Sequence, residues 1–138
     1  MLAKELMSKN PQILPPTATL LQAARYMEKE DCGFIPVIEN GKFIGAVTDR
    51  DIAIRGIAAG KDPKDTTLKE VMTNNVQYCL ETDEEKILID KMIKGKIRRI
   101  AVLNSAKQLS GIISLGDIIV KTHDPNLYEE LVEAVSKH

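Results

Sequence analysis

Two short segments of the chain share a pattern of residue types that could bind a small polar ligand. In both, a glycine is followed three residues later by threonine or serine, and three residues after that by aspartate. We call them the first and second signature: Gly45-Ala46-Val47-Thr48-Asp49-Arg50-Asp51 and Gly111-Ile112-Ile113-Ser114-Leu115-Gly116-Asp117. Each follows an apolar run typical of a buried strand and leads into a helical pattern. Free backbone N–H groups at such a junction favour a phosphate.

The side chains of the signatures extend this chemistry. A threonine or serine hydroxyl can bond a phosphate or sugar oxygen, and a carboxylate three residues later can accept both hydroxyls of a ribose. The glycine carries no side chain, which would let a flat base approach the backbone. The pattern therefore indicates a site for a ligand with a ribose and a phosphate.

A structural role fits the same residues. Thr48 with Asp51, and Ser114 with Asp117, have the spacing of a capping box, and acids in the first turn suit the helix dipole. For either copy alone, capping is the simpler interpretation. Position at the end of a strand, and repetition, favour ligand binding.

Cations are distributed unequally around the two signatures. Arg50 lies inside the first, and Gly116 takes the corresponding place in the second. Arg98 and Arg99, just before the preceding strand, could supply the phosphate partner there. Solvated charge beside a strand is the alternative interpretation of these two arginines.

The whole chain is an internal repeat. Upstream of the signatures, residues match at an offset of 65, and one extra residue in the second hairpin loop makes the offset 66 from there on. The matched pairs include Met7 with Met72, Gln12 with Gln77, Thr17 with Thr82, Met27 with Met92, Val37 with Val102, and Asp51 with Asp117. Two such halves should pack on one another and form clefts related by a pseudo-two-fold axis.

Each half is predicted to contain a strand, a helix, two strands and a second helix. In the first half these are residues 12–14, a helix from the capping box at Thr19 to Asp31, strands 34–38 and 43–47 around an Asn40-Gly41 turn, and a helix over 49–59. Leu20, Ala24 and Met27 are expected to face inward, and Gly33 to end the first helix.

The second half repeats this order. Its elements are strand 76–80, helix 84–94 ended by Gly95, strands 100–103 and 109–114, and helix 115–121, with Ile87, Leu88 and Met92 facing inward. Short helices are expected over 4–7 and 68–72.

A last helix is predicted to start at Asp124-Pro125 and to run to about Lys137. Its apolar stripe is Leu127, Leu131, Ala134 and Val135. The stripe could close the core or meet a partner subunit, and we favour the core. The domain limits expected are 1–60 for the first repeat, 61–67 for a linker, 68–122 for the second repeat and 123–138 for the last helix.

Composition excludes several classes of function. With 138 residues, 43% apolar residues and a net charge of −1, the chain suits one compact module without a general affinity for nucleic acid or anionic membranes. No segment has the length and apolarity of a membrane span or signal peptide, so a cytosolic protein is expected.

Catalytic and metal-binding side chains are sparse. Cys32 and Cys79 form no Cys-x-x-Cys pair, and His123 and His138 lie away from the signatures. We therefore expect no metal site and no catalytic cofactor. A nucleophile with a base is also missing from the pattern, so an enzyme such as a nucleotide hydrolase is disfavoured.

In its whole length the chain resembles a tandem pair of CBS (cystathionine-β-synthase-type) domains, a Bateman module, in its freestanding bacterial form. The residues that carry the resemblance are Leu6-Met7-Ser8, Val71-Met72-Thr73, Ile35-Pro36-Val37-Ile38, Ile97-Arg98-Arg99-Ile100-Ala101-Val102, and the two signatures through Ile52 and Ile118. The resemblance implies an α/β (α+β) fold of two β-α-β-β-α repeats, with two clefts between the sheets.

The resemblance also implies regulatory binding of adenosine-containing ligands, such as AMP, ADP, ATP, NAD or S-adenosylmethionine. Each cleft would combine the signature of one repeat with the first strand of the other. One site would consist of Ala46, Thr48, Arg50, Asp51, Thr73, Val76 and Tyr78. The other would consist of Arg98, Arg99, Ile112, Ser114, Gly116, Asp117, Ser8, Pro11 and Ile13.

In these implied sites the aspartates hold ribose, the hydroxyls ribose or phosphate, and the arginines phosphate. The chain departs from the family at Cys32-Gly33-Phe34, where the second repeat has basic residues, and at Ala101, where Pro36 represents the usual proline. The sites are therefore expected to be unequal, the Asp117 site preferring phosphorylated ligands. One of the two could stay empty.

The family further implies a homodimer and a target protein regulated in trans. The alternative to a sensor is a structural interaction module whose clefts bind no ligand.

Overall fold

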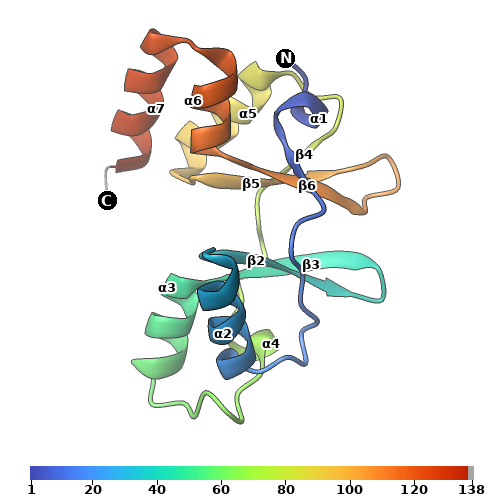
Figure 1. Ribbon diagram of the computed structural model, residues 1–138, viewed down its shortest axis with the longest axis vertical. Coiled ribbons are helices and arrows are strands. Elements are labelled where there is room, and N and C mark those ends of the chain that lie inside the picture. The colour runs from blue at the N-terminus through green and yellow to red at the C-terminus, as the bar shows by residue number, and fades with distance from the viewer. Residues whose placement is uncertain (137–138) are drawn as a thin grey trace. The chain divides into compact units, whose positions relative to one another are not determined.

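The computed structural model describes residues 1–136, except for the side chain of Val135. The described chain forms two compact units. Unit 1 consists of Met1–Pro11 and the chain from Gln77 onward, and unit 2 of Gln12–Val76. Each unit has its own sheet and its own apolar core, so each is described separately (Figure 1).

Unit 2 is built on a hairpin of β2 (Phe34–Glu39) and β3 (Lys42–Thr48), joined by the Asn40-Gly41 turn. Two single bridges extend the hairpin, Leu14 with Val37 in parallel and Ala46 with Thr73 antiparallel. Helices α2 (Leu20–Glu30), α3 (Asp49–Asp51) and α4 (Leu68–Val71) cover one face of the hairpin (Figure 1).

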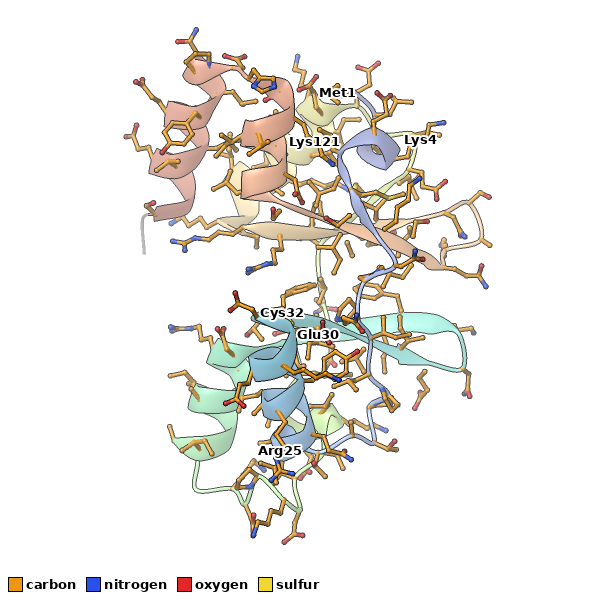
Figure 2. The ribbon with its side chains drawn as sticks, viewed as in Figure 1. Met1, Lys4, Arg25, Glu30, Cys32 and Lys121 are labelled. Atoms are coloured by element: carbon orange, nitrogen blue, oxygen red, sulfur yellow. The ribbon has the colours of Figure 1, made fainter. Side chains whose placement is uncertain are left out.

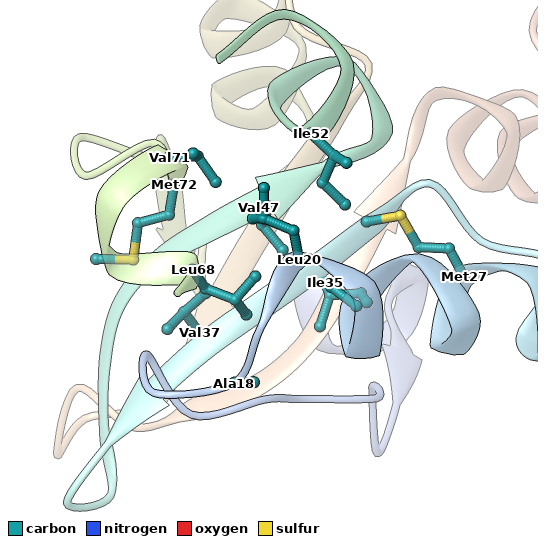
Figure 3. Packing of buried hydrophobic residues seen from close by; sticks show 11 residues of the cluster. Ala18, Leu20, Met27, Ile35, Val37, Val47, Ile52, Leu68, Val71 and Met72 are labelled. Carbon is teal, nitrogen blue, oxygen red and sulfur yellow. The ribbon is translucent and has the colours of Figure 1, made fainter. Parts of the chain in front are cut away.

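The core of unit 2 lies between these helices and the hairpin (Figure 3). Alternating residues of β2 and β3 point into it, as expected for strands with one face on a core. The cluster comprises Ala18, Leu20, Ala23, Met27, Ile35, Val37, Val47, Ile52, Leu68, Val71 and Met72. This packing fixes the end of β3, where the first signature lies.

Unit 1 contains a four-stranded sheet in the order β1-β6-β5-β4. The strands are β1 (Ser8–Lys9), β4 (Tyr78–Leu80), β5 (Arg99–Leu103) and β6 (Leu109–Ser114). The pair β4–β5 is parallel, and the other two pairs are antiparallel. Helices α1 (Ala3–Leu6), α5 (Glu85–Gly95), α6 (Leu115–Thr122) and α7 (Pro125–Ser136) lie on one face of it (Figure 1).

The two units share one topology. In unit 1, Ser8 pairs with Ile112 and Cys79 with Val102. In unit 2 the corresponding pairs are the bridges of Thr73 with Ala46 and Leu14 with Val37. The mixed α/β fold and its internal repeat, both predicted from the sequence, are therefore confirmed.

The compact units do not coincide with the sequence repeats. Residues 1–11 belong to the first repeat by sequence but pack in unit 1 with the second repeat. Residues 68–76 belong to the second repeat by sequence but pack in unit 2. Each repeat thus gives its leading segment to the unit built on the other repeat.

The predicted helix ends need correction. Helix α2 ends because Asp31 adopts the left-handed conformation (φ 50°), not because of Gly33. Helix α5 includes Gly95 and ends at Lys96, which also has a positive φ (51°). A left-handed residue after the last turn satisfies a terminal carbonyl of the helix, whichever side chain it bears.

Two residues expected to face inward do not. Ala24 is exposed and its neighbour Ala23 is buried, while Ile87 is 44% exposed. The packing of each helix against its sheet decides which residues face inward. The spacing of apolar residues in one helix predicts that face only to within a residue or so.

The helix after the first signature also differs from the prediction. After Asp51 the chain continues as a π-helix, η1 (Ile52–Ile57), in place of an α-helix to residue 59. The single turn of wider helix keeps Ile52 and Gly56 buried.

Some strand limits also differ from the prediction. Strand β4 starts at Tyr78 and not at residue 76, and residues 12–14 contribute only the Leu14 bridge.

The last helix starts as predicted, with Asp124 Oδ1 accepting the N–H groups of Asn126 and Leu127. Leu131 is fully buried in the core of unit 1, and Leu127 packs against that core. The stripe therefore closes the core at these positions. The expected end at Lys137 and the side chain of Val135 lie outside the described residues.

Candidate functional site

The first signature forms a closed capping box at the end of β3. The Thr48 N–H donates to Asp51 Oδ2 at 3.0 Å, and the Asp51 N–H donates to Thr48 Oγ1 at 3.0 Å. The structural role predicted for this pair is thus confirmed. Asp51 is 8% exposed, so the residue that closes the box is buried.

Thr73 completes this arrangement from the other end of the unit. Its hydroxyl donates to the Asp51 carboxylate, at 3.3 Å to Oδ2 and 3.4 Å to Oδ1. The Thr73 N–H donates to the Ala46 carbonyl at 2.8 Å, and the Ala46 N–H donates to the Thr73 carbonyl at 3.0 Å. Four of the predicted site residues, Ala46, Thr48, Asp51 and Thr73, therefore meet within unit 2.

The second signature repeats the geometry in unit 1. The Ser114 N–H donates to Asp117 Oδ2 at 2.8 Å, and the Asp117 N–H donates to Ser114 Oγ at 3.0 Å. Ser8 pairs with Ile112 of the same strand. Asp117 is half-buried, so this carboxylate is more open to solvent than Asp51.

The signature glycines leave room for the neighbouring backbone. A Cβ on Gly45 would lie 2.5 Å from the Thr73 carbonyl oxygen, and a Cβ on Gly111 would lie 2.6 Å from the Ser8 carbonyl oxygen. The space beside each glycine is therefore filled by the chain itself. The absence of a side chain thus has a packing reason on this side of the backbone, and the approach of a base stays a prediction.

Charged side chains stand differently around the two signatures. Arg98 and Arg99 are exposed at the start of β5, where the Arg98 carbonyl accepts the Leu115 N–H at 2.8 Å and Arg99 pairs with Ser114. Arg50 is exposed on α3, beside Asp49. Gly116 is exposed on α6, and a Cβ added to it would lie 3.6 Å from Ser114 Oγ.

Gly33 and Asp49 form a further contrast. The Asp49 carboxylate lies against Gly33, 2.7 Å from the place of an added Cβ. Arg98 and Leu115 take these two places in unit 1. The start of the strand is thus acidic in unit 2 and basic in unit 1.

The remaining predicted site residues fall in both units. Val76 is half-buried at the end of unit 2, and Ile13, 46% exposed, also belongs to unit 2. Pro11 and Tyr78 belong to unit 1. Lys91 Nζ lies 5.6 Å from the centre of the Tyr78 ring, a cation–π contact within the unit.

Two basic residues near the signatures were missed by the sequence analysis. Arg55 Nη1 donates to the carbonyls of Met72, at 3.2 Å, and Val71, at 3.4 Å. Lys121 Nζ donates to the Leu6 carbonyl at 2.9 Å. The available signal was their identical place, four residues after the signature aspartate in each repeat.

Other reactive groups stand apart from the signatures. Cys79 is buried, and burial raises the pKa of its thiol to about 12, so a reactive thiolate is disfavoured. Over residues 1–136, no group of three or more His, Cys, Asp or Glu side chains is arranged to hold a metal. None of the helices described there combines the length and apolarity needed to cross a membrane.

Comparison with known proteins places this geometry in a family. The family model described as "CBS domain" matches residues 3–55 and 68–123. Hypoxic response protein 1 of Mycobacterium tuberculosis is 32% identical over 117 residues, which cover 84% of this chain and 81% of that protein. The CBS domain-containing protein YhcV of Bacillus subtilis is 33% identical over 117 residues, covering 85% and 82%.

Solved structures agree with these relatives. Hypoxic Response Protein I, crystallised with two coordinated zinc ions, has a TM-score of 0.80 at 30% identity and covers 88% of this chain and 98% of its own. The CBS domain protein PAE2072 from Pyrobaculum aerophilum, complexed with AMP, has a TM-score of 0.79 at 26% identity, covering 97% and 100%.

A third structure is the CBS domain pair of protein MJ0100, in complex with 5′-methylthioadenosine and S-adenosyl-L-methionine. It has a TM-score of 0.77 at 27% identity and covers 89% of this chain and 96% of its own. Two matched repeats, two signatures of one geometry, and relatives above 30% identity lead to one conclusion: the chain belongs to the CBS domain family, as a tandem pair of CBS domains.

Proposed function

We propose that the protein is a non-catalytic sensor that binds adenosine-containing ligands at its two signatures. The observation that carries the proposal is the duplicated hydroxyl–carboxylate pair at the end of β3 and of β6, Thr48 with Asp51 and Ser114 with Asp117. Similar CBS structures hold AMP, 5′-methylthioadenosine or S-adenosylmethionine. These ligands share an adenosine, which supplies the ribose diol that a carboxylate can accept.

In the proposal, each site combines the signature of one repeat with the leading segment of the other. The first site uses Ala46, Thr48, Arg50, Asp51, Thr73, Val76 and Tyr78. The second uses Arg98, Arg99, Ile112, Ser114, Gly116, Asp117, Ser8, Pro11 and Ile13. The Asp51 carboxylate keeps acceptor capacity at Oδ1, since its contact there is a 3.4 Å interaction at the limit of a hydrogen bond.

The second site is proposed to prefer phosphorylated ligands. Arg98 and Arg99 are exposed at the start of β5, where Arg99 pairs with Ser114 of β6. In unit 2 the corresponding region holds the Asp49 carboxylate against Gly33. A guanidinium binds phosphate by charge-assisted hydrogen bonds, whereas a carboxylate repels it.

The sensor is further proposed to act in the cytosol as a homodimer and to regulate a target protein in trans. A ligand-dependent change would reach such a target through the surface of the CBS pair. A ligand that binds one conformation of the protein more tightly shifts the population toward that conformation.

Thermal unfolding in the presence of a ligand panel tests the proposal. The panel contains AMP, ADP, ATP, NAD and S-adenosylmethionine, with guanosine monophosphate as the control. A ligand at about 100 times its dissociation constant stabilises the folded protein by roughly 2.7 kcal/mol, which raises Tm by several degrees. An adenosine ligand should raise Tm, and Asp51→Asn or Asp117→Asn should reduce the rise.

The asparagine variants keep the size of the side chain, so they are expected to fold. Circular dichroism checks this before titration. The double variant Arg98→Gln/Arg99→Gln should weaken the binding of AMP more than the binding of adenosine. If no adenosine compound changes Tm of the wild type, the sensor proposal fails and the structural interaction module takes its place.

A further inference from the structure

Each signature is adjoined by a segment that begins in a core, at Leu6 or Val71, and pairs only briefly with the signature strand. We call these the adjoining segments: residues 71–73 in unit 2 and residues 6–8 in unit 1. Thr73 is joined to β3 by a single bridge, and β1 is two residues long. Strand pairings this short are marginal by themselves.

The glycines give these segments room but do not hold them. The Thr73 and Ser8 carbonyls lie where a Cβ of Gly45 or Gly111 would be. A substitution of either glycine would push the segment away. Core packing holds Leu6 and Val71, and a polar side chain can fix the carbonyl groups of each segment as well.

A cation does so in both units. Arg55 Nη1, on η1, donates to the carbonyls of Met72 and Val71. Lys121 Nζ, on α6, donates to the carbonyl of Leu6; Figure 2 labels Lys121 beside α1. These carbonyls are at the ends of α4 and α1, where the helix leaves them without an internal partner.

The correspondence between the units argues against coincidence. Arg55 and Lys121 are related by the offset of 66 that relates Asp51 and Asp117, and Val71 and Leu6 by the offset of 65. The side chain differs, guanidinium in one and ammonium in the other. What the two repeats share is a cation four residues after the aspartate and a carbonyl two residues before Thr73 or Ser8.

We infer that Arg55 and Lys121 are positioning residues, each holding an adjoining segment against its signature strand so that the ligand site is complete. The inference rests on the proposed function, because Thr73 and Ser8 belong to the proposed adenosine sites. The cation joins the helical stretch that follows the signature strand to the segment that carries the second hydroxyl. Loss of the cation would leave the aspartate in place and release the hydroxyl.

Amide hydrogen exchange of the full chain tests the inference without any ligand. Arg55→Met should accelerate exchange of the Thr73 and Ala46 amides about fivefold, the change that one ordinary hydrogen bond makes to an opening equilibrium. Arg55→Lys should restore most of the protection. Lys121→Met should leave Thr73 and Ala46 unchanged and accelerate exchange at Ser8 and Ile112. The matched controls are Arg25→Met on α2, labelled in Figure 2, and Lys86→Met on α5.

Binding of AMP provides the second measurement. Arg55→Met should weaken AMP binding at the Asp51 site and leave the Asp117 site unchanged, because a looser segment costs more to order on binding. Lys121→Met should have the reverse pattern. Unchanged exchange at Thr73 and Ala46 in Arg55→Met would overturn the inference. So would equal acceleration throughout β2 and β3, which indicates general destabilisation. A wild type that takes up neither AMP nor any other adenosine compound would refute the proposed function, while the exchange data still decide whether the cations hold the segments.

Discussion

The Asp51 carboxylate combines two roles that could have excluded each other. It accepts the Thr48 N–H and the Thr73 hydroxyl, and it is 8% exposed. Capping leaves capacity on a carboxylate, which has about four lone-pair sites. A capping aspartate is also held in one orientation, and that preorganisation lowers the cost of binding a ribose. Capping and ligand binding are therefore compatible in this signature.

The signature glycines give the clearest residue-scale prediction. Gly45→Ala and Gly111→Ala should each destabilise the fold by about 1–3 kcal/mol, since the new methyl meets a backbone carbonyl that cannot rotate away. Gly95→Ala is the control, because its Cβ would stay 3.6 Å from Ile97 and its helical position favours alanine. Urea unfolding measures the three free energies. Equal effects of all three substitutions would contradict the contacts described.

At the scale of elements, local spacing predicted some features well. The capping boxes at Thr19, Thr48 and Ser114 were predicted because both partners lie within four residues of each other. The helix ends were not predicted correctly, because Asp31 and Lys96 adopt a left-handed backbone conformation that is not typical of their residue types. The π-helix was missed since its apolar spacing is close to that of an α-helix over one turn.

The end of α5 carries the element-scale prediction. Lys96→Gly should stabilise the protein by about 0.5–1 kcal/mol, because glycine adopts a positive φ without steric cost. The same substitution two residues earlier, Lys94→Gly, should destabilise it by up to about 1 kcal/mol, since residue 94 is inside the helix. Chemical denaturation compares the two. Destabilisation by Lys96→Gly would show that the left-handed cap is not formed.

At the scale of the whole molecule, the repeats exchange their leading segments. A repeat pattern shows that Leu6 and Val71 are equivalent, but it cannot show in which unit each one is buried. Ala3 and Leu6 lie in the core of unit 1, whereas Leu68 and Val71 lie in the core of unit 2. That exchange places Thr73 beside the first signature and Ser8 beside the second.

Substitution of the exchanged core residues tests this arrangement. Leu6→Ala should cost about 2–5 kcal/mol and increase amide exchange in β5, β6 and α5 of unit 1. Val71→Ala should cost less, because it removes fewer atoms, and should act on β2, β3 and α2 of unit 2. Hydrogen exchange resolved by residue separates the two patterns. Loosening of α2 and the β2–β3 hairpin by Leu6→Ala would contradict the exchange of segments.

Calorimetric titration of AMP into the full chain shows whether the two signatures bind the ligand. The wild type should give saturable heat, Asp51→Asn and Asp117→Asn should each reduce the stoichiometry, and the double variant should give no binding heat. Arg25→Met should titrate like the wild type. Absence of heat with AMP and every other adenosine compound, or full binding by the folded double variant, would contradict the claim that the two signatures are the ligand sites.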